Sequence, residues 1–339
     1  MSRDEHQSAT SARRGAPKGT RPVRRITNAP LWGGLGLAVV LVLAAGLRAA
    51  YLYELAAAPD FAAPQLDPQL NDYWARALVS GDWRPPPHAA DPQIRSTPYG
   101  RPPGYAYVLA GVYWLGGGSY WAPRLAQAML GLLNVVLMFV LARSLFGRLT
   151  ALLGAGLMAA YWAFVYFEGE LNGPVFTVFL GLVLLHALRA WHARPALWRL
   201  LLAGLVLGVF ALFRPNVLLV GVGVLAWLVW VGRRRAARSG APAGRQGDRS
   251  ERGPSGERAP HGIVSGAAVF AVGCVLAIAP ALVRNYVVAG EFVLISYYGG
   301  VTAYIGNNPQ ARGVSPEIPD IHEISGMSEW NCFTYPKLV

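Results

Sequence analysis

Residues 30–52, PLWGGLGLAVVLVLAAGLRAAYL, decide the fold of this 339-residue chain. The stretch is almost entirely apolar and is long enough for a helix to cross a bilayer, which takes about 20 residues. Further apolar runs of similar length follow at roughly 122–142, 149–167, 173–191, 197–213, 215–231 and 263–283. The sequence therefore predicts an all-α protein, a polytopic bundle of about seven transmembrane helices with a helical extracytoplasmic first loop.

The composition agrees with this fold class. Hydrophobic residues make up 54% of the chain, charged residues only 14%, and the mean hydropathy is +0.34. A soluble domain carries about 25% charged residues. The formal net charge of +12 would fit a nucleic-acid partner, but the basic residues cluster in short segments between the apolar runs, where they set membrane topology. We expect no nucleic-acid partner.

The chain divides by composition into five parts. We predict that residues 1–29 form a disordered, basic cytoplasmic tail and that residues 30–231 form the membrane core, which includes an extracytoplasmic loop at 53–121. Residues 232–262 are rich in Gly, Pro, Ser and Arg and are predicted to be a disordered cytoplasmic linker. A last span at 263–283 and an extracytoplasmic tail at 284–339 follow.

The topology follows from the basic clusters. With one span for each apolar run, every cluster lies on the cytoplasmic side, as the positive-inside rule requires. Residues 105–115 are too short to span and are predicted to lie at the interface, since counting them as a span would invert all that follows. A signal peptide cleaved near Ala56-Ala57-Ala58 is an alternative for the first run, although the long polar leader argues against it. Either interpretation places the next segment outside.

Unusual polar residues gather near the outer ends of the predicted spans. Arginines there can hold a phosphate through charge-assisted bonds, and a carboxylate can take the proton from an attacking hydroxyl. Such residues suit a reaction on a lipid-linked anionic substrate. The set consists of Asp67, Asp72, Glu168, Glu170, Arg214 and Arg284.

Each of these residues also has a simpler interpretation. Asp67 could be a solvated loop acid, and Glu168 and Glu170 could mark the end of a loop. Arg214 could be a turn residue that reaches to water, and Arg284 could anchor a helix at the interface. The two cysteines and six histidines show no disulfide or metal-binding spacing, so we predict no metal site from these residues.

An ordered set of motifs adds to this interpretation. The stretches are LDPQLNDYWARALVSGDW (66–83), GRPPGYAYVLAGVYWLGG (100–117), PRLAQAMLGLLNVVLMFVLARSLFGR (123–148), YFEGELN (166–172), ALFRPN (211–216), and RNY (284–286) followed by GGVTAYIGNNPQARG (299–313). Together they resemble the GT-C membrane glycosyltransferases, in particular the branch of protein O-mannosyltransferases, aminoarabinose transferases and Rgt-like enzymes. The resemblance covers roughly residues 30–315.

The resemblance implies roles for particular residues. In the family an Asp follows the first span, eight residues before an Ala; Asp67 and Ala75 match, which implies that Asp67 is the catalytic base. The second acid that often follows is replaced here by Pro68. Arg101, before a Pro-Pro pair, matches the residue that contacts the lipid phosphate.

Further roles are assigned with the same family in view. Glu170, and after it Glu168, corresponds to a further acid of the family, and Asp72 joins them as an acceptor-binding or auxiliary group. Arg214 and Arg284 are assigned to the donor phosphate from their side of the membrane alone.

The same resemblance implies an activity and a location. The expected enzyme is an inverting hexosyl- or pentosyltransferase in the bacterial plasma membrane, with a polyprenyl-phosphate sugar as donor and a lipid, glycan or protein as acceptor. No cofactor is required by the residues, while a divalent cation, used by some relatives, is the open alternative. Family members usually continue with more helices or a soluble domain, so the resemblance predicts a truncated chain.

Two other functions fit a polytopic chain. A transporter or lipid flippase would place charged or broken helices near mid-membrane and would show paired halves. A non-catalytic scaffold or a polysaccharide ligase is the third possibility. We expect an enzyme if Asp67, Arg101 and Glu170 meet in one outward-facing pocket, and a transporter if a mid-membrane cavity is found instead.

Overall fold

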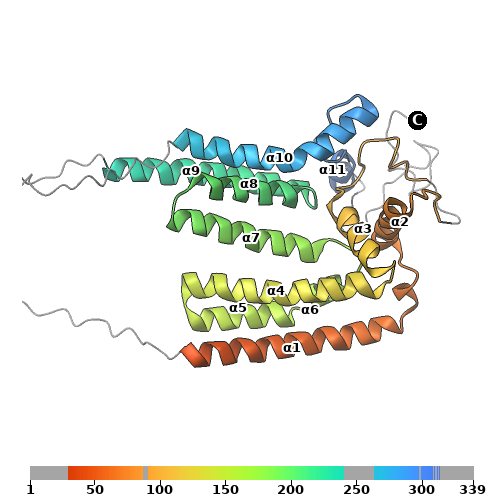
Figure 1. Ribbon diagram of the computed structural model, residues 1–339, viewed down its shortest axis with the longest axis horizontal. Helices are drawn as coiled ribbons and strands as arrows, with labels where there is room; N and C mark the ends of the chain where they lie inside the picture. The colour runs from red at the N-terminus through yellow and green to blue at the C-terminus, as the bar shows by residue number, and fades with distance from the viewer. Residues whose placement is uncertain are drawn as a thin grey trace, which may run out of the picture.

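The computed structural model describes residues 30–86, 91–239, 263–297, 299–307, 309, 311 and 313. The predicted basic tail (1–29), residues 240–262 of the predicted linker, and the tail from residue 314 onward lie outside the described residues. Within the described part the structure is a bundle of long helices with shorter helices gathered at one end (Figure 1).

The helices follow one another with short connections. In chain order they are α1 (Pro30–Ala56), η1 (Pro59–Phe61), α2 (Leu66–Ser80), α3 (Gly104–Gly116), α4 (Trp121–Phe146), α5 (Arg148–Ala160), α6 (Trp162–Gly169), α7 (Pro174–Ala193), α8 (Leu197–Ala211), η2 (Pro215–Val217), α9 (Leu218–Ser239), α10 (Ile263–Ala289) and α11 (Gly299–Asn307).

Five segments of the described residues are long and apolar enough to cross a membrane: α1, α4, α7, the segment 215–234 formed by η2 and most of α9, and α10. The pair α5–α6 passes the same test as one bent span, and α8 is a shorter apolar helix. These seven segments run up and down the bundle (Figure 1). The prediction of an all-α, multi-pass membrane protein is confirmed, and the five or six candidate spans together with α8 agree with about seven.

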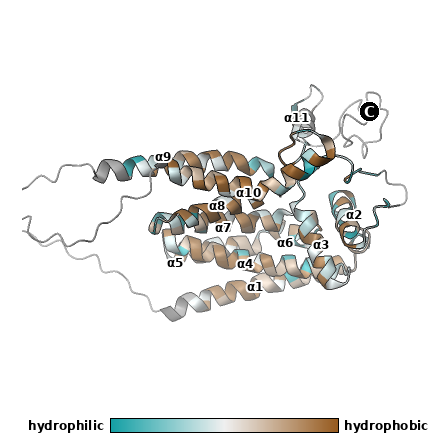
Figure 2. Cartoon of the chain, turned by 45° about the horizontal axis from the view of Figure 1, so that its top comes forward, coloured by the Kyte–Doolittle hydropathy of each residue, from teal (hydrophilic) through white to brown (hydrophobic). Residues whose placement is uncertain are grey.

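Polar and apolar residues separate along the bundle. The long helices are mainly hydrophobic, whereas α2 and the connections around it carry more hydrophilic residues (Figure 2). Helices α2, α3 and α11 lie at one end, here called the α2–α3 end, and the α4–α5 turn and the end of α9 lie at the opposite end (Figure 1). Among the described residues, the predicted cytoplasmic arginines near the α4–α5 turn and the end of α9 therefore lie at the end away from α2.

The two helices of the first loop have clear local causes. Helix α2 buries Trp74, Ala75 and Ala77 on its apolar side and ends at Gly81, whose φ of 75° favours glycine. Helix α3 starts after Pro103 and ends at Gly117, again with positive φ (62°). At 13 residues α3 is too short to span, as its predicted interfacial position requires.

Three predicted boundaries differ from the structure. The run 149–167, predicted as one helix, bends by 48° at Tyr161, whose extended backbone (ψ 111°) ends α5. Helix α9 continues through residues 232–239 of the predicted linker, because these arginines and alanines are good helix formers. Helix α10 extends to Ala289, beyond the predicted end at 283 and through the polar pair Arg284-Asn285.

Helices α8 and α10 pack closely because glycines line their interface. A Cβ on Gly204 would fall on the carbonyl oxygen of Phe270, and one on Gly208 would fall on that of Cys274. From the other side, a Cβ on Gly273 would overlap the backbone of Leu201. Small residues of this kind let the backbones of membrane helices approach one another, which supplies van der Waals packing where no hydrophobic effect acts between helices.

This packing yields a first prediction. Gly204→Ala should lower the melting temperature of the detergent-solubilised protein, because the new methyl group forces α8 from α10 at a cost of about 1–3 kcal/mol. The matched control is Gly223→Ala on α9, where a Cβ meets nothing within 4 Å. An equal effect of the two substitutions in a thermal unfolding assay would contradict the close α8–α10 contact.

Candidate active site

Asp67 and Arg101 form an ion pair at the α2–α3 end of the bundle. Arg101 Nη1 donates to Asp67 Oδ1 at 2.5 Å, across 34 residues of sequence. The Asp67 side chain is 54% exposed and that of Arg101 27% exposed, so both can be reached from solvent. The structure thus brings together the predicted base and the predicted phosphate ligand.

The backbone around Asp67 is unusual. Asp67 lies in the first turn of α2, where the positive end of the helix dipole favours a carboxylate. Leu66 directly before it has a φ of 57°, a conformation that residues with a side chain seldom adopt. A non-glycine residue with such a positive φ destabilises the fold by about 1–3 kcal/mol, and residues of this kind gather at functional sites. Leu66 therefore supports a functional role for the start of α2.

The loop that carries Arg101 is held by the end of α10. The Asn285 side chain, fully buried, accepts from the backbone N–H of Tyr99 at 2.9 Å. Its Nδ2 donates to the carbonyl oxygens of Val293 and Ile295, both at 3.0 Å. Tyr297 N–H in turn donates to Tyr99 O at 3.1 Å. The segment before Arg101 is therefore fixed to the segment after α10.

Arg284 takes part in the same attachment. Its guanidinium donates to the carbonyl oxygens of Thr97 (2.5 Å) and Ile94, and it lies 4.2 Å from the centroid of the Tyr99 ring. The sequence-based prediction assigned Arg284 to the donor phosphate. In the structure its guanidinium donates to the loop, so Arg284 helps to hold the chain that leads to Arg101, and its assignment to the donor phosphate stays a prediction.

A small pocket of about 40 Å³ lies behind Arg101. Its walls include the aromatic side chains of Trp74, Tyr99 and Tyr297. The Trp74 and Tyr99 rings are tilted against one another with centroids 5.4 Å apart. Burial, and then the hydrogen bond with Tyr107, raise the pKa of Tyr99, so its hydroxyl stays protonated at neutral pH. The pocket gives the Arg101 side of the pair a rigid, largely apolar backing.

Asp72 lies on the other side of α2. Its carboxylate accepts from Arg76 Nε at 2.9 Å, from the Tyr113 hydroxyl at 2.5 Å and from the Tyr120 hydroxyl at 3.1 Å. Burial, and then the bond to Asp72, raise the pKa of Tyr113, which keeps this donor protonated. Asp72 thereby ties α2 to α3 and to the start of α4. Five residues along a helix from Asp67, it points to a different face.

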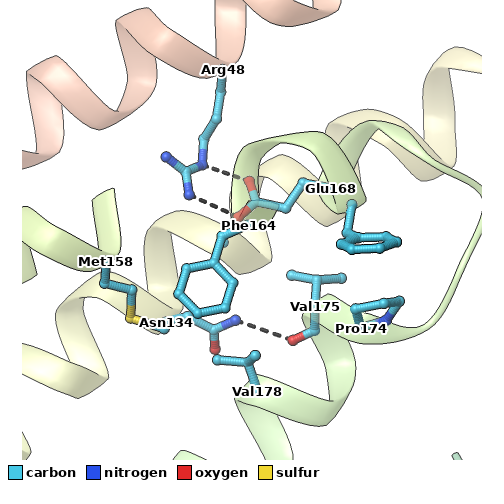
Figure 3. Close-up of a pocket in the computed structure, with 10 residues that line it drawn as sticks. Arg48, Asn134, Met158, Phe164, Glu168, Pro174, Val175 and Val178 are labelled. Carbon is cyan, nitrogen blue, oxygen red and sulfur yellow. Dashed lines mark hydrogen bonds and ion pairs between the residues drawn. The ribbon is translucent and has the colours of Figure 1, made fainter. Parts of the chain in front are cut away.

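Glu168 lies inside the bundle. Arg48 of α1 reaches it with Nη2 at 2.7 Å from Oε1 and Nε at 2.6 Å from Oε2, and both side chains are at most 5% exposed (Figure 3). The cavity beside this pair has about 10 Å³, close to the room that one water molecule needs. The structure thus places Glu168 away from the Asp67–Arg101 pair, in a buried ion pair of its own.

Glu170 lies two residues further on, outside the spans. It is partly buried, with Asp60, Arg124, Tyr51 and Tyr166 close enough to act on its charge. Burial, followed by the negative charge of Asp60, raises the pKa of Glu170, and Arg124 only partly offsets this. Glu170 is thus a carboxyl group at the α2–α3 end whose titration is shifted toward neutral pH.

Arg214 is exposed, directly before η2 at the same end of the bundle. Two residues before it, the Leu212 carbonyl accepts from the Gly104 N–H at 2.9 Å, which ties the end of α8 to the start of α3. Arg214 therefore shares the end of the bundle predicted for it.

A divalent cation does not fit the surroundings of Asp67. Its carboxylate is paired with the cationic Arg101, and Pro68 stands where a second acid would be needed. Within the described part of the chain, no three His, Cys, Asp or Glu side chains come together as metal ligands.

Sequence reasoning missed the residues that join these groups. Arg48 could have been found from the sequence, because a charged residue inside an apolar run is a recognised sign of function. Asn285 adjoins Arg284 in the quoted RNY motif. Asn71, Arg124 and Gln127 carried no comparable signal, because a polar residue on a partly buried helix reveals its partner only in three dimensions.

A comparison with protein families now bears on this site. Residues 100–243 match the family described as dolichyl-phosphate-mannose-protein mannosyltransferase. The matched segment, less than half of the chain, begins one residue before Arg101 and includes α3 to α9. The match confirms the resemblance to the GT-C branch and supports membrane glycosyltransferase activity. Comparisons with curated proteins and with solved structures gave no match.

The environment of Glu170 yields a prediction about pH. Because the folded state raises the pKa of Glu170, the folded state binds this proton more tightly than the unfolded state, and stability from this group falls as pH rises through the shifted value. Glu170→Gln should therefore raise the melting temperature at pH 7, and the gain should shrink as pH falls toward the ordinary value for Glu. A thermal unfolding series in detergent from pH 4 to pH 8 measures this. A gain that grows toward acid pH would contradict the assignment.

Proposed function

We propose that this protein transfers a sugar from a polyprenyl-phosphate donor to an acceptor hydroxyl, with Asp67 as the base and Arg101 as the ligand of the donor phosphate. The observation that carries the proposal is the 2.5 Å contact between these two side chains at the α2–α3 end. The family match supports a lipid-linked sugar as the donor. The acceptor is a glycan, a lipid or a protein.

The ion pair suits a reaction in which the two partners separate. A partly exposed ion pair contributes only about 0–1 kcal/mol, so the arriving phosphate can take over the Arg101 guanidinium at little cost. Asp67 is then free to accept a proton. Binding of the donor would thus separate Asp67 from Arg101 and leave Asp67 able to act as the base while Arg101 binds the phosphate.

The chemical step is an in-line displacement. The acceptor hydroxyl oxygen forms a bond to the anomeric carbon while the bond from this carbon to the phosphate oxygen breaks, which inverts the configuration. The hydroxyl proton passes to Asp67, and the electron pair leaves with the polyprenyl phosphate, whose charge Arg101 stabilises. Glu170, with its raised pKa, is assigned as an auxiliary acid or acceptor ligand near the same end.

We assign the α2–α3 end to the extracytoplasmic face of a bacterial plasma membrane. The positive-inside rule supports this, because the arginine clusters at the α4–α5 turn, the α7–α8 turn and the end of α9 lie at the other end (Figure 1). The donor would approach from the lipid beside α3, whose exposed side chains include Tyr107, Trp114 and Leu115.

One observation favours transport instead. The α5–α6 helix is broken, and a buried Arg48–Glu168 pair lies beside the break, as in transporters. The cavity there, about 10 Å³, is far smaller than a sugar. Transfer of a sugar at the α2–α3 end is therefore the function we propose, with transport as the alternative.

Removal of the proposed base gives a sharp test. Asp67→Asn should lower kcat by about 10²- to 10⁴-fold, as expected for the loss of a general base. Membranes are incubated with radiolabelled polyprenyl-phosphate sugars (mannose, glucose, galactose and arabinose), and label in the acceptor fraction is counted. Asp82→Asn is the matched control, since Asp82 is also paired with an arginine of this loop. Full activity of Asp67→Asn would remove Asp67 from its role.

Removal of the proposed phosphate ligand should act on donor binding. Arg101→Ala should raise the KM for the donor by about 10- to 100-fold, the value of a charge-assisted hydrogen bond, with a smaller rise in Arg101→Lys. It should also lower kcat, because Arg101 stabilises the charge of the leaving phosphate. Arg84→Ala is the control, because Arg84 is 88% exposed and bound to Asp82. A donor KM unchanged in Arg101→Ala would count against the phosphate assignment.

A further inference from the structure

The buried Arg48–Glu168 pair needs an explanation beyond stability. Arg48 lies eight residues before the end of α1, roughly 12 Å along the helix axis from it. Moving two charges into such surroundings is costly, and apolar residues of similar size often stabilise a protein as well or better. A buried pair of this kind is therefore better suited to fixing a position than to adding stability.

The surroundings of the pair are shaped to hold it. Arg48 Nη1 also donates to the carbonyl oxygens of Ala44 (3.1 Å) and of Ala159, next to the α5–α6 break (3.3 Å). On α4, a Cβ at Gly131 would overlap the Glu168 carboxylate, so only glycine leaves room for it. Helices α1, α4 and α6 thus meet at the Glu168 carboxylate, which Figure 3 shows beside Arg48.

Glu168 begins a turn, residues 168–171, in which every backbone carbonyl accepts a hydrogen bond from a side chain. Gln127 Nε2 donates to Glu168 O (2.8 Å) and to Glu170 O (2.7 Å), and Arg124 Nε donates to Gly169 O (2.9 Å). The next carbonyl, that of Leu171, accepts from Asn71 Nδ2 of α2 at 2.9 Å. The turn at 168–171 therefore joins α1, α4 and α2.

This turn also reaches α2 through packing. The Leu171 side chain is fully buried in a cluster that includes Ala75 of α2 and Tyr105 and Tyr113 of α3. Tyr105 donates to Gln127 Oε1 at 2.8 Å, which closes the connection to α4. Asn71 lies one helical turn after Asp67, so the position of the turn is passed to the start of α2.

We propose that the Arg48–Glu168 ion pair is a positioning device for Asp67, acting through the 168–171 turn and Asn71. The pair sets the turn against α1, and the turn sets α2 against the rest of the bundle. This inference rests on the proposed function for its kinetic consequence, while its geometric consequence stands by itself. Arg48 and Glu168 touch no reacting atom and are positioning residues.

The test replaces the pair by apolar residues of similar length. Arg48→Met with Glu168→Met removes both charges, so the double variant should fold with a melting temperature close to the native one. Its kcat should fall by about 10- to 100-fold with the donor KM nearly unchanged, since a base displaced by about 1 Å loses rate of that order. The single variant Arg48→Lys, which keeps the positive charge beside the native Glu168, should have a kcat between those of the double variant and the native protein. A double variant with native kcat overturns the proposal.

Asn71→Ala tests the same connection outside the ion pair. It should lower kcat similarly, and adding it to the double methionine variant should cause little further loss, because both act along one path. If the double variant fails to fold, Asn71→Ala alone decides, and native kcat there overturns the proposal. His186→Leu is the matched control, since His186 contacts the Leu137 carbonyl inside the bundle, away from the turn.

A distance measurement separates this inference from the proposed function. Spin labels at Tyr53→Cys on α1 and Val79→Cys on α2, both exposed positions, report the α1–α2 distance in a background without the native cysteines. The distribution should broaden or shift in the double methionine variant and in Asn71→Ala, but not in His186→Leu. An unchanged distribution overturns the positioning role. A native chain that transfers no sugar removes the proposed function and leaves this measurement valid.

Discussion

The structure depends on one constraint, the absence of water from the hydrocarbon layer of a membrane. Every backbone group there must be satisfied within helices, and every charged side chain must find a partner. Arg48 and Glu168 obey this rule inside the bundle. The remaining acids and arginines discussed for the site gather at the α2–α3 end, where water can reach Asp67 and Arg101. The separation of polar from apolar residues that builds the bundle therefore also places the site.

The part of the fold set by this constraint could be predicted from the sequence. Runs of apolar residues locate the spans to within a few residues, and the short length of 104–116 sets that helix apart. The bend at Tyr161 could not be predicted, since neither Pro nor Gly stands at the break. Helix ends were also missed where polar residues continue a helix, as Arg284 and Asn285 do in α10.

Only part of the candidate site could be predicted from the sequence, because the sequence does not show which side chains meet in space. The resemblance pointed to Asp67 and Arg101, which the structure brings into contact across 34 residues, while their catalytic roles stay predictions. The direction in which a side chain points could not be predicted from the sequence. Arg284 was assigned to the donor phosphate from its side of the membrane, yet only the structure places its guanidinium on the carbonyls of Ile94 and Thr97. Glu168 and Glu170, two residues apart, belong to different environments for the same reason.

The attachment of the first loop to α10 bears on how the protein is made. The loop leaves the ribosome early, but the groups that hold it, Arg284 and Asn285, follow it by some 190 residues of synthesis. Until α10 enters the membrane beside α8, the chain before Arg101 lacks its anchor. The site is thus completed only after α10 has been inserted, so a nascent chain has no assembled catalytic pair while the helices before α10 are being placed.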